Sequence, residues 1–262
     1  DAGLYVIINI HWEGGWLNHP VDANKEALDE RLEAMWKQIA LRFRDYDDRL
    51  LFAGTNEVNN DDANGTQPTE ENYRVQNGFN QVFVNTVRAT GGRNHYRHLI
   101  VQAYNTDVAK AVAHFTMPLD IVQNRIFLEC HYYDPYDFTI MPNDENFKSQ
   151  WGAAFAGGDV SATGQEGDIE ATLSSLNVFI NNNVPVIIGE YGPTLRDQLT
   201  GEALENHLKS RNDYIEYVVK TCVKNKLVPL YWDAGYTEKL FDRTTGQPHN
   251  AASIAAIMKG LN

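Results

Sequence analysis

The alternation of short β-rich runs with helical stretches is the feature that most constrains the fold of this chain. Six such runs lie at 4–12, 50–57, 98–104, 126–133, 184–192 and 228–236. Strands that alternate with helices are typical of a parallel sheet, whose faces are buried by those helices. The sequence therefore predicts an α/β fold built from six βα units.

The stretches between the runs carry apolar residues at spacings of three and four, the period of a helix with one buried face. We expect helices at 23–46, 72–90, 168–182, 202–224 and 251–261, and a shorter helical or irregular connection at 107–124. Trp36 falls in the apolar stripe of the first helix and is predicted to be core. Residues 134–167 are rich in glycine and aromatic side chains, so we expect a large loop at the functional end of the sheet.

Composition limits the class of protein and its partners. The 262 residues are 43% hydrophobic, which is enough for a large core, and one domain over 1–262 is expected. The formal net charge of -13 argues against nucleic acid or an anionic membrane as a partner, because both need a basic surface. No apolar run is long enough for a membrane span. Cys130 and Cys222 lie in apolar segments and are expected to be small core residues.

Two of the strand-like runs end in a glutamate. The run VPVIIGEYG, at 184–192, delivers Glu190, and LLFAGTNE, at 50–57, delivers Glu57. The carboxyl end of a buried parallel strand is where α/β folds place their chemistry. A single acid there could merely cap the next loop, but two strands of the same design indicate a pair.

Polar residues gather at the ends of several runs, which favours a (β/α)8 TIM barrel over a doubly wound sheet. No glycine-rich nucleotide-binding motif follows any strand, so nucleotide-binding functions are not supported. Six βα units are two fewer than a complete barrel needs.

Five motifs identify a resemblance that covers nearly the whole chain. They are IINIHW with GGW (7–16), FAGTNE (52–57), HYYDP (131–135), IIGEYG (187–192) and WDAG (232–235). In order and spacing they resemble glycoside hydrolase family 5, especially its endoglucanase and xyloglucanase-like members. The resemblance implies a catalytic barrel over 1–262 in which the first run is barrel strand three. Strands one and two would then lie upstream of Asp1, in a complementary N-terminal barrel segment.

The chain departs from that family at three positions. Trp12 stands where a second histidine is common, Val58 where proline is common, and Ala234 where asparagine is frequent. None of them removes a carboxylate, so the departures bear on the sugar subsites more than on the reaction class.

The resemblance implies retaining hydrolysis of a β-glycosidic bond by double displacement. This reaction needs two carboxyl groups about 5–5.5 Å apart, one to protonate the leaving oxygen and one to attack the anomeric carbon. The residues expected in these roles are Glu57 as acid/base and Glu190 as nucleophile.

Other residues of the motifs are expected to support the pair. Asn56 would bond the sugar 2-hydroxyl, Tyr133 would donate its hydroxyl to the nucleophile, and His131 and His11 would donate at the floor of the site. The alternative for each histidine is an ordinary hydrogen bond at the end of the barrel.

Three tryptophans could offer a flat apolar face to a sugar ring. They are Trp232, Trp16 and, from the long loop, Trp151. A tryptophan is more often part of the core, so that alternative stays open for Trp16 and Trp151.

One stretch partly matches a calcium-binding loop, through Asn60, Asp62, Asn64, Gly65 and Glu71. Pro68 interrupts the pattern and no helix enters it, which favours a solvated loop. We predict no metal and no cofactor.

The leading hypothesis is an extracellular endo-β-1,4-glucanase, whose partner is a β-glucan such as cellulose or xyloglucan, as polysaccharide or oligosaccharide. The alternative is a non-catalytic barrel fragment that binds saccharide or needs the complementary N-terminal segment. A third possibility, a metal-assisted lyase, is less well matched because it would need carboxylate ligands at successive strand ends.

Overall fold

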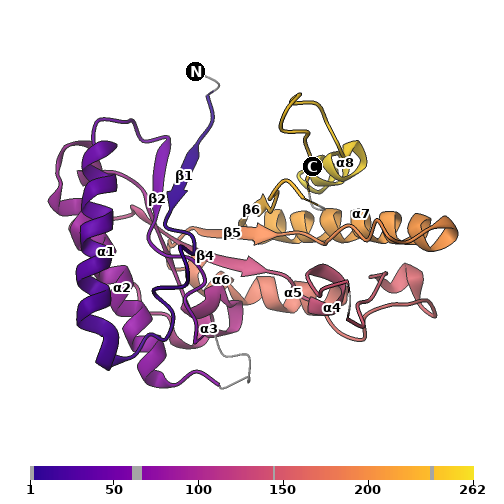
Figure 1. Cartoon of the computed structure of the whole chain (residues 1–262), viewed down its shortest axis with the longest axis horizontal. Helices are drawn as coiled ribbons and strands as arrows, with labels where there is room; N and C mark the ends of the chain where they lie inside the picture. The colour runs from indigo at the N-terminus through magenta and orange to yellow at the C-terminus, as the bar shows by residue number, and fades with distance from the viewer. Residues whose placement is uncertain (1–2, 61–66, 144, 237–238) are drawn as a thin grey trace. The chain divides into compact units, whose positions relative to one another are not determined.

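The computed structural model of the chain describes residues 3–60, 67–143, 145–236 and 239–262 (Figure 1). The chain forms two compact units. The first comprises Asp1–Cys130 and Val178–Val186, and the second comprises His131–Asn177 and Ile187–Asn262.

Parallel strands form the centre of the first unit. They are β1 (Val6–Asn9), β2 (Leu50–Ala53), β3 (Leu99–Gln102) and β4 (Ile126–Tyr132), and each pairs in parallel with the next. Every residue of β2 and β3 is buried, as expected for strands covered on both faces. The backbone N–H of Leu128 donates to the carbonyl of Pro185 at 3.0 Å, next to the start of β5 (Val186–Tyr191).

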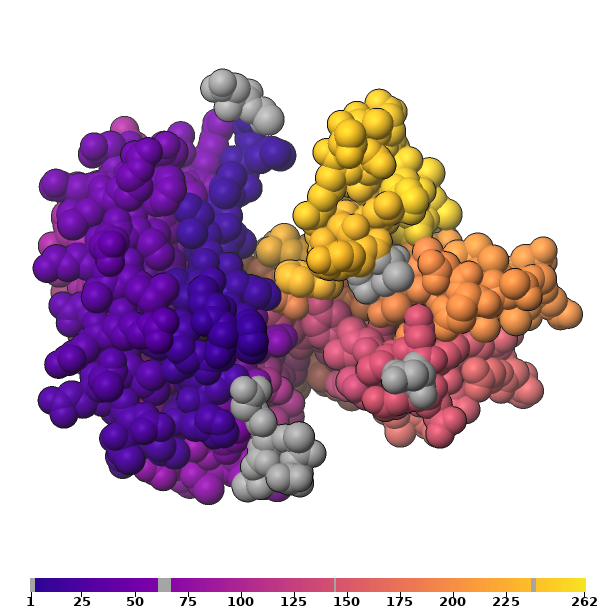
Figure 2. Space-filling view, viewed as in Figure 1, coloured from indigo at the N-terminus to yellow at the C-terminus, as the bar shows by residue number. Residues whose placement is uncertain are grey.

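Helices cover the strands of the first unit. They are α1 (Asp22–Arg42), α2 (Glu70–Ala89) and α3 (Val108–His114), with the short η1 (Gly92–His95), η2 (Tyr104–Thr106) and most of α6 (Asn177–Ile180). Figure 1 shows α1 and α2 side by side, and the outer side of α1 is part of the indigo surface in Figure 2.

Trp36 anchors α1 to the sheet of the first unit. Its side chain is fully buried, its indole N–H donates to the carbonyl of Gly54 at 2.8 Å, and its ring packs on Phe52 and Phe83. Gly54 has no room for a side chain, since a Cβ there would lie 2.6 Å from the Phe83 ring. The prediction that Trp36 belongs to the core is confirmed.

The second unit contains the end of β4, most of β5 and β6 (Val228–Tyr231). The strands β5 and β6 pair in parallel, with Ile187 opposite Val228. The helices are α4 (Tyr136–Thr139), η3 (Ala153–Phe155), α5 (Glu166–Ser175), α7 (Gly201–Lys224) and α8 (Ala251–Gly260). Of these, α7 packs against both α5 and α8.

Trp151 lies in the core of the second unit and not on its surface. It is only 2% exposed, its indole N–H donates to the carbonyl of Gly164 at 2.6 Å, and its ring meets Tyr214 edge-on. Of the two possibilities left open for Trp151, the core position is confirmed, and the sugar-binding one is wrong because the side chain is buried among its neighbours.

The order of the six predicted strands and of the long helices is confirmed. The helix expected at 168–182 is instead two helices, α5 and α6, and the loop expected at 134–167 contains α4 and η3. The ladder of β1 runs only from Val6 to Asn9, opposite Leu50 to Ala53 of β2. Cys130 and Cys222 are buried and free, as predicted. Six parallel strands that alternate with helices are consistent with part of a (β/α) barrel. The single domain and the two further strands stay predictions.

Within the described parts of the chain, every helix is too short or too polar to cross a membrane.

A buried histidine gives the second unit a pH-dependent stability. His207 is fully buried, its Nδ1–H donates to the Ser149 carbonyl at 2.8 Å, and its Nε2 accepts the Arg196 N–H at 3.0 Å. Burial lowers the pKa of His207 to about 4. The ring is therefore held neutral by its surroundings, since Nε2 acts as an acceptor.

We expect acid to destabilise the protein through His207. The unfolded histidine binds a proton near pH 6.5 and the folded one only near pH 4, so the stabilisation is complete above about pH 6.5 and falls as pH drops towards 4. The loss amounts to about 3 kcal/mol. His207→Gln, which keeps one donor and one acceptor, should flatten this slope in denaturant unfolding measured from pH 7 to pH 4. The exposed His249→Gln is the control, and an unchanged slope in His207→Gln would contradict the assignment.

Candidate functional site

Glu57 stands at a sharp turn just after β2, in the first unit. Its φ of 47° is unusual for a residue other than glycine and needs support from neighbouring groups. Its backbone N–H donates to Gln102 Oε1 at 3.2 Å, and its carbonyl accepts from Asn59 Nδ2 at 2.8 Å. The main chain of Glu57 is thus held on both sides, and its side chain is half-buried.

The other predicted site residues of the first unit are Asn56, His11 and Trp16. Asn56 is half-buried beside Glu57, and His11 is exposed beyond β1, where its Nδ1 lies 3.3 Å from Asn9 Nδ2. Trp16 is half-buried and packs against the core, with the guanidinium of Arg31 4.4 Å above its ring. Arg31 therefore covers one face of the Trp16 ring.

Glu190 is the centre of a cluster in the second unit. It is 8% exposed, and its Oε2 accepts a hydrogen bond of 2.9 Å from the hydroxyl of Tyr133. The Nδ1 atom of His131, itself 7% exposed, lies 3.5 Å from the same oxygen. The three residues come from the ends of β4 and β5, so the predicted association of His131, Tyr133 and Glu190 is present in this unit.

A bulge in β5 sets the direction of Glu190. Ile188 lies opposite Pro229 and Tyr191 opposite Tyr231, so two residues of β5, Gly189 and Glu190, face the single residue between them on β6. A bulge of this kind changes the direction in which a side chain points. The motif residue Gly189 thus stands beside Glu190 where the ladder is interrupted.

Trp232 follows β6 and is half-buried. Its backbone N–H donates to the Tyr191 carbonyl at 2.9 Å, which ties it to the end of β5. The next residue, Asp233, accepts from the N–H groups of Gly235 at 2.9 Å and Leu240 at 2.8 Å. Burial raises the pKa of Asp233, but these bonds outweigh it and the pKa lies below its usual value.

Sequence reasoning missed two polar residues on the strands of the first unit. Gln102 ends β3 and is fully buried, and Glu129, on β4, is 8% exposed. Gln102 Nε2 donates to Glu129 Oε2 at 3.0 Å. The available signal was the same as for Glu57, namely a polar side chain within or at the end of an apolar strand.

The partial calcium motif falls mainly on Asp62, Asn64 and Gly65, which lie outside the described residues. Of its other members, Glu71 Oε1 accepts the backbone N–H of Asp22 at 2.9 Å. This bond gives the Glu71 carboxylate a role at the start of α1.

The two glutamates predicted for the site are held in different ways. Glu57 is fixed through its main chain, whereas Glu190 is fixed through its carboxylate. A carboxylate that accepts a tyrosine hydroxyl is favoured in its ionised form, as a nucleophile requires.

Comparison with known proteins gives a family match over most of the chain. The family model described as "Cellulase (glycosyl hydrolase family 5)" matches residues 1–238. Endoglucanase A of Paenibacillus barcinonensis is 34% identical over 284 residues, an alignment that covers 100% of this chain and 68% of that protein. The chain spans between 30% and 64% of the length of seven further curated relatives.

Solved structures agree with this match. A family 5 xyloglucanase from Paenibacillus pabuli is 35% identical with a TM-score of 0.90, covering 99% of this chain and 76% of that one. A broad-specificity endoglucanase from Bacteroides salanitronis is 34% identical with a TM-score of 0.87, covering 99% of this chain and 72% of that one.

The turn that follows Glu190 requires a glycine at position 192. Gly192 has a φ of 151°, and a Cβ there would lie 3.0 Å from the Tyr231 ring. Gly192→Ala should therefore lower the free energy of unfolding by about 1–3 kcal/mol in urea titration.

Gly167→Ala is the matched control. Gly167 lies in α5, where a Cβ would meet no other atom within 4 Å, and alanine there should be neutral or stabilising. If both substitutions changed the free energy of unfolding by the same amount, an added side chain at position 192 would not strain the turn.

Proposed function

Since this chain belongs to glycosyl hydrolase family 5, we propose that it is a retaining endo-β-1,4-glucanase that acts on β-glucan, cellulose or xyloglucan. The observation that carries the proposal is the setting of Glu190, whose carboxylate accepts the Tyr133 hydroxyl at 2.9 Å beside His131. A second glutamate, Glu57, follows β2 in a supported turn.

Glu190 is the nucleophile of this proposal. Its carboxylate attacks the anomeric carbon and forms a glycosyl ester, while the bond to the leaving oxygen breaks. Tyr133 and His131 both contact Oε2, so they orient the carboxylate plane for attack. The hydroxyl of Tyr133 also favours the ionised state before attack.

Glu57 is the general acid and then the general base. In the first step its proton passes to the leaving glycosidic oxygen; in the second step its carboxylate takes a proton from the water that opens the ester. The same carboxyl group must be correctly placed in both steps, which is why the support of its main chain matters.

The remaining motif residues are proposed to bind the sugar. Asn56 bonds the 2-hydroxyl next to the bond that is cut, and His11 donates to a hydroxyl at the floor of the site. Trp232 and Trp16 offer aromatic surface to the apolar face of sugar rings. For Trp16 the available face is the one that Arg31 does not cover.

The names of the relatives support the proposed substrate class. Their names include endoglucanase, xyloglucanase and broad-specificity endoglucanase, and we propose the same range of β-glucans here. We also propose that the protein acts outside the cell, because such polymers are too large to be taken up intact.

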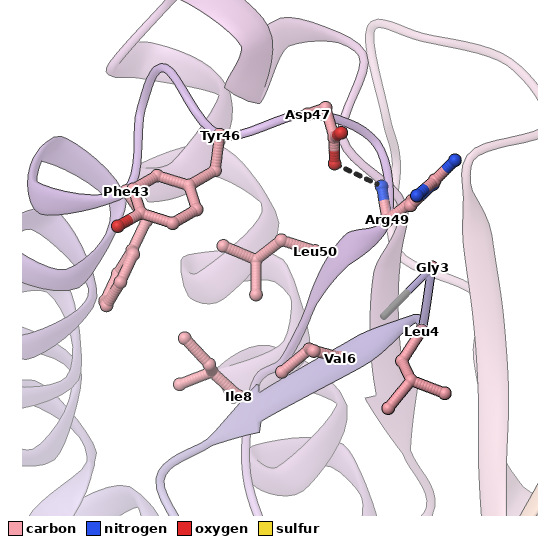
Figure 3. A pocket seen from close by; sticks show the side chains of 9 residues that line it. All are labelled: Gly3, Leu4, Val6, Ile8, Phe43, Tyr46, Asp47, Arg49 and Leu50. Atoms are coloured by element: carbon pink, nitrogen blue, oxygen red, sulfur yellow. Dashed lines mark hydrogen bonds between the residues drawn. The ribbon is translucent and has the colours of Figure 1, made fainter. Parts of the chain in front are cut away.

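A complementary barrel segment is proposed as a partner of β1. Large apolar side chains are exposed at the start of β1 and just before it: Leu4 is 71%, Tyr5 74% and Val6 51% exposed. Leu4, Val6 and Leu50 line a cavity in the first unit (Figure 3). Its volume is about 420 Å³. An unpaired strand edge with apolar neighbours is suited to pairing with a further strand.

The catalytic roles are tested with two substrates, soluble β-glucan and a dinitrophenyl β-cellobioside. Glu190→Gln should abolish reducing-sugar release from both. Glu57→Gln should lower kcat/KM on β-glucan by roughly 10³-fold, but much less on the aryl glycoside, whose leaving group needs no proton. Azide should restore turnover of the aryl glycoside by Glu57→Gln, because it attacks the glycosyl ester without a general base. Saccharide binding without hydrolysis by the unmodified protein would favour the non-catalytic alternative.

The role of β1 is tested by adding a segment with two βα units from a family 5 relative. Activity on β-glucan should rise, and Val6→Lys should reduce this gain because it places a charge at the exposed strand. Leu119→Lys, at another exposed apolar residue of the first unit, is the control. If the segment leaves activity unchanged, β1 is not its binding edge.

A further inference from the structure

Gln102 connects the turn at Glu57 to the interior of the first unit. Its Oε1 accepts two hydrogen bonds, from the Glu57 N–H at 3.2 Å and from the Thr55 hydroxyl at 3.4 Å. Gln102 and Thr55 are both fully buried, so no solvent competes with these bonds. One side-chain oxygen therefore supports the strand end that carries Glu57.

Glu129 fixes the orientation of the Gln102 amide. Its Oε2 accepts from Gln102 Nε2 at 3.0 Å. An ionised carboxylate can only accept hydrogen bonds, so the NH₂ group must face Glu129 and Oε1 must face Glu57. If the amide were reversed, two acceptors would meet at Glu129 and two donors at Glu57.

The main chain of Gln102 is held from the other side by α2. Its carbonyl accepts from Asn80 Nδ2 at 2.8 Å and from Gln76 Nε2 at 3.2 Å. Both amide side chains are fully buried. Gln102 is thus fixed at its main chain and at both ends of its side chain.

Loss of the Gln102 amide would release the turn at Glu57. The positive φ of Glu57 is retained only while its surroundings support it. Without the acceptor, the Glu57 N–H loses its partner and the main chain can relax, which displaces the carboxyl group at the end of a flexible side chain.

We propose that Gln102, oriented by Glu129, is a positioning residue that holds Glu57 for proton transfer. The inference rests on the proposed function, because it assigns the acid/base role to Glu57. It adds two residues, on β3 and β4, that do not touch the substrate but determine how well the acid/base residue is aligned.

The test compares kcat/KM on β-glucan with kcat/KM on a dinitrophenyl β-cellobioside. Gln102→Met keeps the approximate volume but removes both hydrogen-bonding ends. It should lower kcat/KM on β-glucan roughly 100-fold, because a displacement of about 1 Å can cost that much, and on the aryl glycoside less than about 5-fold. The kcat on the aryl glycoside should fall and recover with azide, since the base step is also impaired.

Gln81→Met is the matched control, with the same change on the same unit. Gln81 also uses its amide for hydrogen bonds, to Asn85 Oδ1 and to the main chain of Leu119, but it lies on the outer part of α2. It should leave the ratio of the two kcat/KM values unchanged. Both variants are assayed where urea titration shows them folded.

Glu129→Gln is a second, milder variant that does not contact Glu57. An amide at 129 can donate or accept, so it no longer dictates how Gln102 is turned. We expect a smaller loss of kcat/KM than in Gln102→Met, and again a larger loss on β-glucan than on the aryl glycoside. If Gln102→Met does not fold, the two kcat/KM values of Glu129→Gln by themselves test the positioning role.

The outcomes separate this inference from the proposed function. Absence of hydrolysis by the unmodified protein would overturn the function itself. If the unmodified protein is active but the Gln102 and Glu129 variants lose kcat/KM equally on both substrates, the positioning role is overturned and the function is left intact. A selective loss on β-glucan, with azide recovery, supports it.

Discussion

Burial of parallel strands on both faces is the constraint on which the first unit depends. Because β2 and β3 have no exposed residue, any polar side chain inside must find its partner within the protein. Thr55, Gln102 and Glu129 meet this requirement by bonding one another, and the Glu57 N–H joins them. The same requirement that keeps the core stable therefore also fixes the main chain of Glu57, the proposed acid/base residue.

The second unit fixes its glutamate in a different way. There a bulge in β5 sets the direction of Glu190, and Tyr133 and His131 contact its carboxylate directly. The contrast suits the proposed roles. A nucleophile stays ionised until it attacks, so a hydrogen-bond donor on its oxygen stabilises the form that reacts. An acid/base residue changes protonation twice in each cycle, so support of its main chain holds it in place in both protonation states.

The tryptophans show where sequence reasoning reaches its limit. Trp36 was recognisable as core from helical spacing, and it is fully buried. Trp151 sits in an irregular loop without any periodicity, so the sequence left open whether it is buried and did not indicate Tyr214 as its partner. Trp16 follows a motif, yet the guanidinium that covers one face of its ring comes from α1. Contacts of this kind depend on how distant segments pack, which local sequence patterns do not encode.

The sequence by itself determined the order of strands and helices and the family, and it predicted roles for the two glutamates and for Asn56, His131, Tyr133 and Trp232. These follow from hydrophobic periodicity and local motifs, which act over a few residues. Only the tertiary structure decided that Gln102 and Glu129 support Glu57, because these residues lie 45 and 72 positions away in the chain. It also decided that Glu190 sits in a bulge, since a bulge exists only when one strand is paired with another.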